Sequence, residues 1–374
     1  MNAFIHTFSP SGDGPSIAIK DSIDIAGYPT RAASRALAGA PPAAEHADVV
    51  KHVLAAGWTI AGKANMHELA FGMTGINDYT GTAVNPQNPT RIPGGSSSGS
   101  ASAVGLGLAD AALGTDTGGS IRGPAACCGV IGLKPTFSRI SRRGVVPNES
   151  TLDCVGPFAR EMRVLTDVMA AIAPDFDVTS ARKPPVGYSI GLVSVDAAVE
   201  VRAAISYAAA KADLSSRMLE LEGLAAAFDA GLTLINAETW HAFGYLMHTG
   251  QLGADVAARL RAASQTTTAQ LEEAERVRRV FTASVDHALS AVDILLLPTL
   301  PALPITIQAA RSGTSVLAMS SLIRPFNLSG HPALSLPVPV AGSSLKTGLQ
   351  IVGRKGADEQ VCAVAAHIEA ALAS

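Results

Sequence analysis

Hydrophobic and polar positions change their period repeatedly along the chain, as they do in proteins that mix strands with helices. Alternating or continuous apolar runs predict strands at residues 16–25, 58–61, 109–115, 130–133, 186–193, 218–221, 293–297, 333–339 and 348–352. Helical spacing predicts helices at 47–56, 65–71, 97–106, 161–172, 197–211 and 358–372, and an almost wholly helical region at 224–289. Residues 173–185 are expected to form a surface linker. Strands and helices mixed in this way predict an α/β fold layered around one sheet.

The composition is that of a soluble globular protein, with 374 residues of which 48% are hydrophobic and 16% charged. A formal net charge of −3 offers no basic excess for binding nucleic acid. No apolar run reaches the roughly 18 residues of a membrane span, and no signal peptide is visible. The expected cysteine state is buried free thiols, at Cys127, Cys128, Cys154 and Cys362. We therefore expect a cytoplasmic protein that binds neither nucleic acid nor membranes.

The stretch from residue 91 to residue 136 carries the clearest chemical signal. It holds two turns rich in glycine and hydroxyl groups, at residues 94–100 and 115–120, around one apolar segment. Glycine lets the backbone approach a ligand closely, and a helix is expected to begin just after Ser120. Unpaired backbone N–H groups at such a turn can hold an anionic oxygen. A serine hydroxyl beside such donors is the minimum requirement for acyl transfer, but a base is also needed.

One interpretation takes Ser97 as the nucleophile. Residues 95–99 fit the G-x-S-x-G pattern of α/β-hydrolases, which requires a preceding strand and a histidine partner. Residues 88–93 would make a poor strand because proline removes ladder donors. None of the nine histidines lies in a turn with obvious catalytic neighbours, and none joins a cluster with metal-ligand spacing. Structural roles are therefore the simpler expectation for the histidines.

A second interpretation needs no histidine. Lys20 lies within an apolar strand, and burial would favour its neutral form, which can accept a proton from a serine hydroxyl. A lysine within a strand more commonly faces solvent, so the local pattern alone leaves the question open.

A resemblance to a known family bears on this choice. The chain resembles the amidase signature family at Lys20-Asp21, residues 93–97, residues 114–122 and residues 132–136. Similar blocks recur at residues 153–157, 297–299, 326–335 and 348–350, so the resemblance covers nearly the whole chain. It implies an α/β/α fold in which helices sandwich a mixed sheet. It also implies a single amidase domain over 1–374, with a signature core at about 16–160, a variable helical pocket region at about 174–290, and C-terminal strands and a helix at 291–374.

The same resemblance implies a set of site residues. Ser120 corresponds to the nucleophile, Ser96 to the bridging serine with a cis peptide bond before it, and Lys20 to the base. The oxyanion hole would use the backbone N–H groups of Thr117, Gly118, Gly119 and Ser120, with no metal or organic cofactor. Further residues could bind substrate or support the site: Arg122 and Asp116 beside the nucleophile, Ser97 as a helix cap or as a support for Ser96, and Arg324.

The function implied is hydrolysis of a linear amide, giving a carboxylate and ammonia or an amine through an acyl-enzyme. The middle region, residues 173–252, is compact, so we expect a small amide that is polar or carboxylated. Two departures from the family pattern are Ser22, where many relatives carry Asn, and only 19 residues before Lys20. A homodimer is possible. The alternative is a glutaminase-type amidotransferase subunit that releases ammonia for a partner, whereas a non-catalytic role is disfavoured because all three triad positions are retained.

Overall fold

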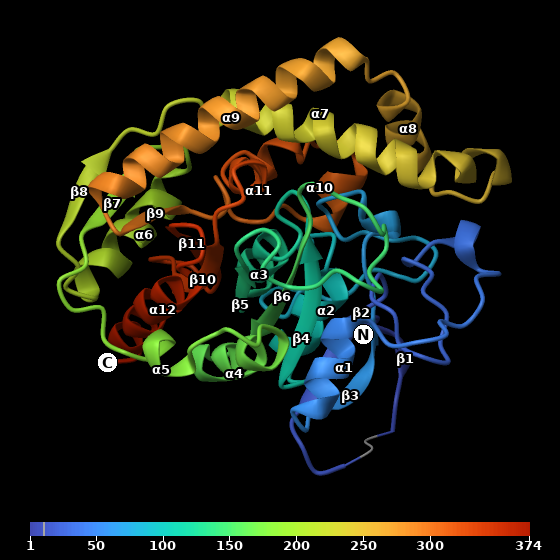
Figure 1. Ribbon diagram of the computed structural model, residues 1–374, viewed down its shortest axis with the longest axis horizontal. Helices are drawn as coiled ribbons and strands as arrows, with labels where there is room; N and C mark the ends of the chain where they lie inside the picture. Colours follow the sequence, from blue (N-terminus) through green and yellow to red (C-terminus); the bar gives the residue numbers. More distant parts are fainter. Residues whose placement is uncertain (10–11) are drawn as a thin grey trace.

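A large mixed β-sheet forms the centre of the molecule in the computed structural model, which describes residues 1–9 and 12–374 (Figure 1). In these residues the sheet has 11 strands in the order β1-β3-β2-β4-β6-β5-β10-β11-β9-β7-β8. The strands are β1 (Phe4–Thr7), β2 (Ser16–Lys20), β3 (Thr59–Ala64), β4 (Ala111–Asp116), β5 (Ile131–Lys134), β6 (Cys154–Ala159), β7 (Ile190–Val193), β8 (Ser216–Leu219), β9 (Ile294–Pro298), β10 (Ala333–Pro339) and β11 (Lys346–Gly353). Strands β3, β2 and β4 are parallel, as are β9, β7 and β8, whereas the strands between β4 and β9 pair antiparallel.

Helices cover both faces of the sheet, which confirms the expected α/β/α arrangement (Figure 1). The α-helices are α1 (Asp48–Ala55), α2 (Ser98–Gly105), α3 (Arg122–Cys128), α4 (Met162–Ile172), α5 (Val178–Ala181), α6 (Val199–Lys211), α7 (Leu224–Phe243), α8 (Ala254–Ala263), α9 (Thr268–Ala291), α10 (Ile307–Arg311), α11 (Arg324–Leu328) and α12 (Asp358–Ala373). Helices α1, α4, α6 and α12 pack on one face, and α2 and α3 pack on the other. The long helices α7 and α9 lie side by side and contact α11.

The two faces are packed by different kinds of side chain. Helix α4 buries Leu165, Val168, Met169 and Ile172, a helical stripe that faces the main core. Helix α2 contains only Ser, Gly, Ala and Val, so it can approach the sheet closely. A Cβ atom at Gly99 would lie 2.4 Å from the backbone oxygen of Asn65. This close packing fixes the start of α2 against the sheet.

Three local expectations were wrong. Residues 65–71 form only a 3-10 turn at Glu68–Ala70, with Leu69 at a φ of 52°, because tertiary bonds such as Leu69 N–H to the Ala32 carbonyl outweigh the apolar spacing. The expected strand at 16–25 ends at Lys20, where a turn begins. The expected linker at 173–185 contains helix α5, whose N-cap is the Asp177 side chain.

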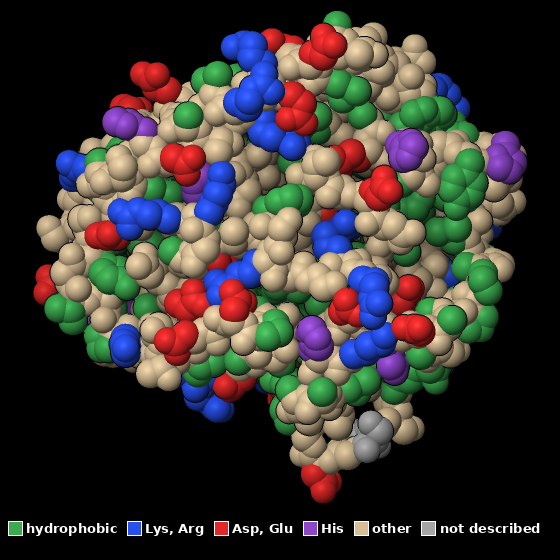
Figure 2. All heavy atoms as spheres, in the orientation of Figure 1, with side chains coloured by type: hydrophobic (Ala, Val, Ile, Leu, Met, Phe, Trp, Pro, Cys, Tyr) green, Lys and Arg blue, Asp and Glu red, His purple; other side chains and the backbone are tan. Residues whose placement is uncertain are grey.

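Strand β6 was not expected, because its sequence CVGPFA contains glycine and proline. It is nevertheless fully buried between β4 and β5. Among the described residues, no helix combines the length and the apolar character needed to cross a membrane. On the face drawn in Figure 2, acidic and basic side chains are intermixed.

The packing of α9 against α11 can be tested at Phe281. This side chain is 2% exposed, and its ring lies 6.3 Å from that of Phe326 in α11. We predict that Phe281→Ala lowers the free energy of unfolding by about 3–5 kcal/mol, since it leaves a cavity. Denaturant unfolding would measure this loss. The neighbouring Val280 is 59% exposed, so Val280→Ala should change stability by less than about 0.5 kcal/mol; equal effects of the two substitutions would contradict this packing.

Candidate active site

The parallel pairing of β2 with β4 brings the predicted base to the serine-rich turns. Lys20 is the last residue of β2, and Thr115 and Asp116 end β4. Because the strands are parallel, their carboxyl ends meet at one edge of the sheet. Lys20 is fully buried there, which excludes the solvent-facing alternative for this lysine.

The Lys20 amine is held between two hydroxyl groups. Its Nζ lies 2.7 Å from Ser96 Oγ and 2.7 Å from Thr115 Oγ1, and 3.5 Å from the Thr115 carbonyl oxygen. Burial lowers the pKa of Lys20 to about 7, although the negative charges of Asp153 and Asp116 act to raise it. A substantial fraction of this amine is therefore neutral at neutral pH and can accept a proton.

Ser96 and Ser120 belong to two turns that are joined through their backbones. The Gly95–Ser96 peptide bond is cis, as the family resemblance implied. Ser97 N–H donates to the Ser120 carbonyl at 3.2 Å, and His67 N–H donates to the Ser96 carbonyl at 3.0 Å. No hydrogen bond joins the hydroxyls of Ser96 and Ser120 in the described structure, and such bonds commonly tighten only when substrate binds.

The turn before Ser120 presents fewer free donors than expected. Gly119 N–H donates to Asp116 Oδ1 at 2.7 Å, so this donor is committed to the protein and does not fit the predicted role in the oxyanion hole. The N–H groups of Thr117, Gly118 and Ser120 have no hydrogen-bond partner among the described residues. These three groups remain available to an anionic oxygen.

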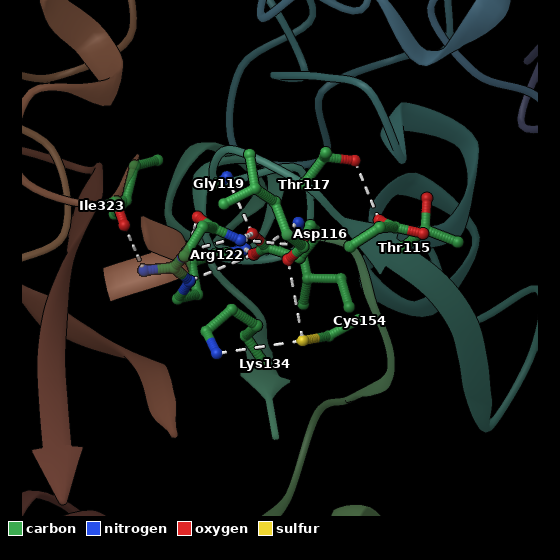
Figure 3. Close-up of polar contacts among 12 residues, drawn as sticks. Thr115, Asp116, Thr117, Gly119, Arg122, Lys134, Cys154 and Ile323 are labelled. Carbon is green, nitrogen blue, oxygen red and sulfur yellow. Dashed lines mark hydrogen bonds and ion pairs between the residues drawn. The ribbon is translucent and has the colours of Figure 1, made fainter. Parts of the chain in front are cut away.

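Asp116 and Arg122 form a fully buried pair that shapes this turn (Figure 3). The guanidinium donates through Nε and Nη2 to the two carboxylate oxygens of Asp116, at 3.0 and 2.9 Å. Its remaining donors bind the Ile323 carbonyl, Gln350 Oε1 and Asn327 Oδ1. All five N–H groups of Arg122 are thus used within the protein, which leaves it no donor for a substrate carboxylate.

The carboxylate of Asp116 organises the backbone as well. Burial alone would raise its pKa, but the Arg122 charge and the hydrogen bonds from Arg122 and Asn327 hold the pKa of Asp116 well below its usual range. The ionised carboxylate also accepts from the N–H groups of Ile121 and Arg122, at 3.1 and 3.2 Å. Of the two roles considered for Asp116 and Arg122, the structure therefore supports structural support of the site over substrate binding.

Ser97 connects the two turns and does not cap α2 with its side chain. Its Oγ lies 3.2 Å from the Thr115 carbonyl oxygen, to which it donates, and it is fully buried. The segment before it, residues 86–96, contains no strand. The α/β-hydrolase interpretation of Ser97 therefore lacks both its strand and an accessible hydroxyl.

Two residues near Lys20 had no role assigned from the sequence. Thr115 contacts the amine directly, and Asp153 accepts from Thr117 Oγ1 at 2.8 Å while pairing with Arg142 at 3.0 Å. Asp153 lies in one of the blocks of family resemblance, which was the available signal. Ser22 forms no hydrogen bond with the Lys20 amine, and its buried hydroxyl has no hydrogen-bond partner within residues 1–9 and 12–374.

A cleft of about 900 Å³ is lined by residues that include Met73, Thr74, Asn236, Arg259 and Arg324, and Arg324 is the one predicted site residue in its lining. A larger groove of about 1040 Å³ lies between residues 146–151 and α7, and none of the predicted site residues lines it. We associate the smaller cleft with the predicted site, because Arg324 lies close to the turn at residues 117–120: a Cβ atom built at Gly118 would lie 3.5 Å from Arg324 Nε.

The cysteines are buried free thiols, as expected. Burial raises the pKa of Cys127 to about 12 and that of Cys154 to about 11, so neither is a ready nucleophile. Cys154 lies 4.0 Å from Lys134 Nζ (Figure 3). In the described chain, no group of three or more His, Cys, Asp or Glu side chains is arranged to hold a metal ion.

Comparisons with known proteins agree with this geometry. The family model described as Amidase matches residues 13–220 and 188–362. A Glutamyl-tRNA(Gln) amidotransferase subunit from Methanospirillum hungatei is 32% identical over 415 aligned positions, covering 96% of this chain and 95% of that protein. The counterpart from Halobacterium salinarum is also 32% identical and covers 99% of both chains. A crystal structure of an amidase superposes with a TM-score of 0.87 at 32% identity, covering 96% of this chain and 84% of the other. The chain belongs to the amidase family, whose members hydrolyse carbon–nitrogen bonds.

Proposed function

We propose that this chain hydrolyses the C–N bond of a small carboxamide through an acyl-enzyme, with Ser120 as nucleophile, Ser96 as proton relay and Lys20 as base. The observation that supports this most strongly is the buried contact of 2.7 Å between Lys20 Nζ and Ser96 Oγ. A buried amine with a pKa near 7 can exchange a proton at neutral pH. Ser120 ends the adjacent turn, and its carbonyl accepts a hydrogen bond from Ser97 N–H, next to Ser96.

The reaction would proceed in two halves. Ser120 Oγ attacks the amide carbon while its proton passes to Ser96, and the Ser96 proton passes to Lys20 Nζ. The tetrahedral oxygen accepts hydrogen bonds from the N–H groups of Thr117, Gly118 and Ser120; one such donor contributes about 3–4 kcal/mol in comparable sites. The protonated lysine then returns a proton through Ser96 to the departing nitrogen. Water, activated by the same relay, cleaves the ester to a carboxylate.

Three neighbouring residues would act as supports rather than as reactants. Asp116 and Arg122 hold the oxyanion turn, and Ser97 ties it to the turn that carries Ser96. Arg122 also donates to Asn327 in α11 and Gln350 in β11, so this support joins elements far apart in the sequence, which supports our proposal that the chain is a single amidase domain. In that domain, the core at about 16–160 carries the reacting groups and the helical region at about 174–290 borders the cleft.

The comparisons favour an ammonia-releasing component of an amidotransferase over a free-standing amidase. The curated relatives reported above carry the name of an amidotransferase subunit and match over nearly their whole length. In this role glutamine would be the amide donor, and a partner protein would receive the ammonia. The free-standing amidase is the second candidate, supported by the crystallised amidase of equal identity.

These two roles differ in whether the chain has a stable partner. The test is to purify the tagged chain from its native cells under mild conditions and to measure the mass of the particle and its composition. A stoichiometric second protein, together with hydrolysis of glutamine, supports the amidotransferase role. A particle that contains only this chain, as a monomer or a homodimer, and that hydrolyses other small amides supports the free-standing amidase.

Substitutions at the three reacting positions test the triad. We predict that Ser120→Ala, Ser96→Ala and Lys20→Ala each lower amide turnover by at least about a thousandfold, since nucleophile or proton transfer is lost. Turnover of a primary amide and intact-mass detection of fluorophosphonate labelling would measure these effects. Ser97→Ala is the matched control and should still be labelled. Loss of labelling in Ser97→Ala, or its retention in Ser120→Ala, would contradict the assignment.

The pH dependence of turnover follows from the Lys20 pKa. The base must be neutral, and its neutral fraction grows as pH rises through about 7. We therefore predict that kcat/KM falls about tenfold per pH unit well below pH 7 and levels off above about pH 8. Stopped assays between pH 5 and pH 9 would measure the profile. Activity that is flat from pH 5 to pH 9 would show that no group with this pKa serves as the base.

Asp153 provides a way to move that profile. Its negative charge raises the Lys20 pKa, so Asp153→Asn should lower the pKa and shift the acid limb of the kcat/KM profile to lower pH. Asparagine keeps an acceptor for Thr117. Glu273 is exposed on α9 and pairs with Arg276, so Glu273→Gln should leave the limb in place. A limb that moves to higher pH in Asp153→Asn would refute this electrostatic link.

A further inference from the structure

Arg324, the first residue of α11, is a buried cation with little of its hydrogen-bonding capacity in use. The residue is 5% exposed, and its guanidinium lies 4.2 Å from the centre of the Phe228 ring. Nη2 donates to Ser320 Oγ at 2.7 Å and Nη1 to the Phe228 carbonyl at 3.4 Å, whereas Nε is buried without a hydrogen-bond partner among the residues that the structure describes. Only two of its five N–H groups are thus bonded, and both bond to neutral oxygens.

The hydrogen bonding of Arg324 differs from that of Arg122, the other buried arginine described above. All five guanidinium N–H groups of Arg122 donate to acceptors within the protein, and its charge is paired with that of Asp116. Arg324 has no carboxylate within ion-pair distance among the described residues, and neither has Arg259, which also lines the cleft; the more distant charge of Asp229 acts to raise the Arg324 pKa. Two further arginines line the cleft, Arg35 and Arg311, and Arg311 pairs with Asp78. A buried charge without a direct ion-pair partner is costly to the folded protein. Such a cost is typical of a group that serves a ligand.

The position of Arg324 links the cleft to the reacting atoms. Its Nε would lie 3.5 Å from a Cβ atom at Gly118, which is two residues before Ser120 in the oxyanion turn. Arg324 also lines the cleft of about 900 Å³. Burial lowers the pKa of Arg324 to about 10, so the side chain remains cationic at neutral pH. A group bound by this guanidinium therefore lies only a short chain of atoms from the scissile carbonyl.

We propose that Arg324 binds a carboxylate on the substrate, so that the site selects short amides that carry a negative charge at the end remote from the scissile bond. The inference rests on the proposed amide hydrolysis and specifies its substrate class. Carboxylates accept two parallel N–H bonds from a guanidinium, which gives both energy and orientation. The monoamides of short dicarboxylic acids have this chemistry, and so does glutamine, which adds an amino group.

The test compares glutaramate with pentanamide, a neutral amide with a carbon chain of similar length. For the wild-type chain we expect kcat/KM for glutaramate to exceed that for pentanamide at least tenfold. In Arg324→Gln we expect this ratio to fall at least tenfold, chiefly through a higher KM for glutaramate; a tenfold change corresponds to about 1.4 kcal/mol. Arg276→Gln, on the exposed face of α9, is the matched control and should keep the wild-type ratio. An unchanged ratio in Arg324→Gln would overturn the inference.

Two further measurements separate the possible failures. Calorimetric binding of glutarate to the Ser120→Ala chain needs no turnover and should be lost when Arg324→Gln is added; equal binding in both would also overturn the inference. If Arg324→Gln does not fold, Arg324→Lys should give an intermediate ratio, because it keeps the charge and loses the planar fork, and a wild-type ratio there would count against the proposal.

Glutamine as a third substrate distinguishes an amino acid from a simple dicarboxylic monoamide, and preference for either over pentanamide supports the subsite. If the wild-type chain is labelled by a fluorophosphonate but hydrolyses pentanamide and glutaramate with equal kcat/KM, only the carboxylate subsite is contradicted. Wild-type chain that neither reacts with the probe nor hydrolyses any amide contradicts the proposed function itself.

Discussion

The site depends on keeping an amine out of water at the end of a strand. Lys20 is fully buried, and Ser96 and Thr115 are its closest polar partners. Burial disfavours the charged form of the amine, and the acids nearby only partly offset this effect. Without the parallel pairing of β2 with β4, the lysine would not meet the turns that carry the two serines. In the proposed mechanism, the fold thus supplies through Lys20 the base that histidine supplies in the Ser-His-Asp hydrolases.

A second constraint concerns how the protein uses its two buried arginines. All five N–H groups of Arg122 are bonded, to Asp116, Asn327, Gln350 and a carbonyl oxygen, so Arg122 fixes the shape of the turn proposed as the oxyanion hole. Arg324 lies close to the same turn, and most of its donors have no partner in the described part of the chain. The first arrangement favours rigidity, and the second leaves a positive charge facing a cleft. Together they suit a reaction in which a charged substrate is held close to a preorganised turn.

Sequence patterns predicted much of this molecule because its strands and long helices have clear periods. They did not predict β6, because glycine and proline are unfavourable in strands. Pairing with β4 and β5 nevertheless holds this segment in the sheet. The triad positions came from family resemblance, since the spacing around Lys20 was equally compatible with a solvent-facing side chain. The engagement of the Gly119 N–H by Asp116 could not be inferred, because it depends on how the turn folds back on a neighbouring carboxylate. Long-range contacts of this kind leave no local pattern.

The central claim is that the Lys20 amine is neutral over part of the physiological pH range. Nitrogen-15 NMR of lysine-labelled protein, with Lys20→Met to assign the resonance, reads the protonation state of this amine directly. Our account predicts that the Lys20 Nζ signal titrates with a midpoint near pH 7, far below the usual value near 10. A signal that remains that of an ammonium group up to pH 9 would show that Lys20 cannot be the base.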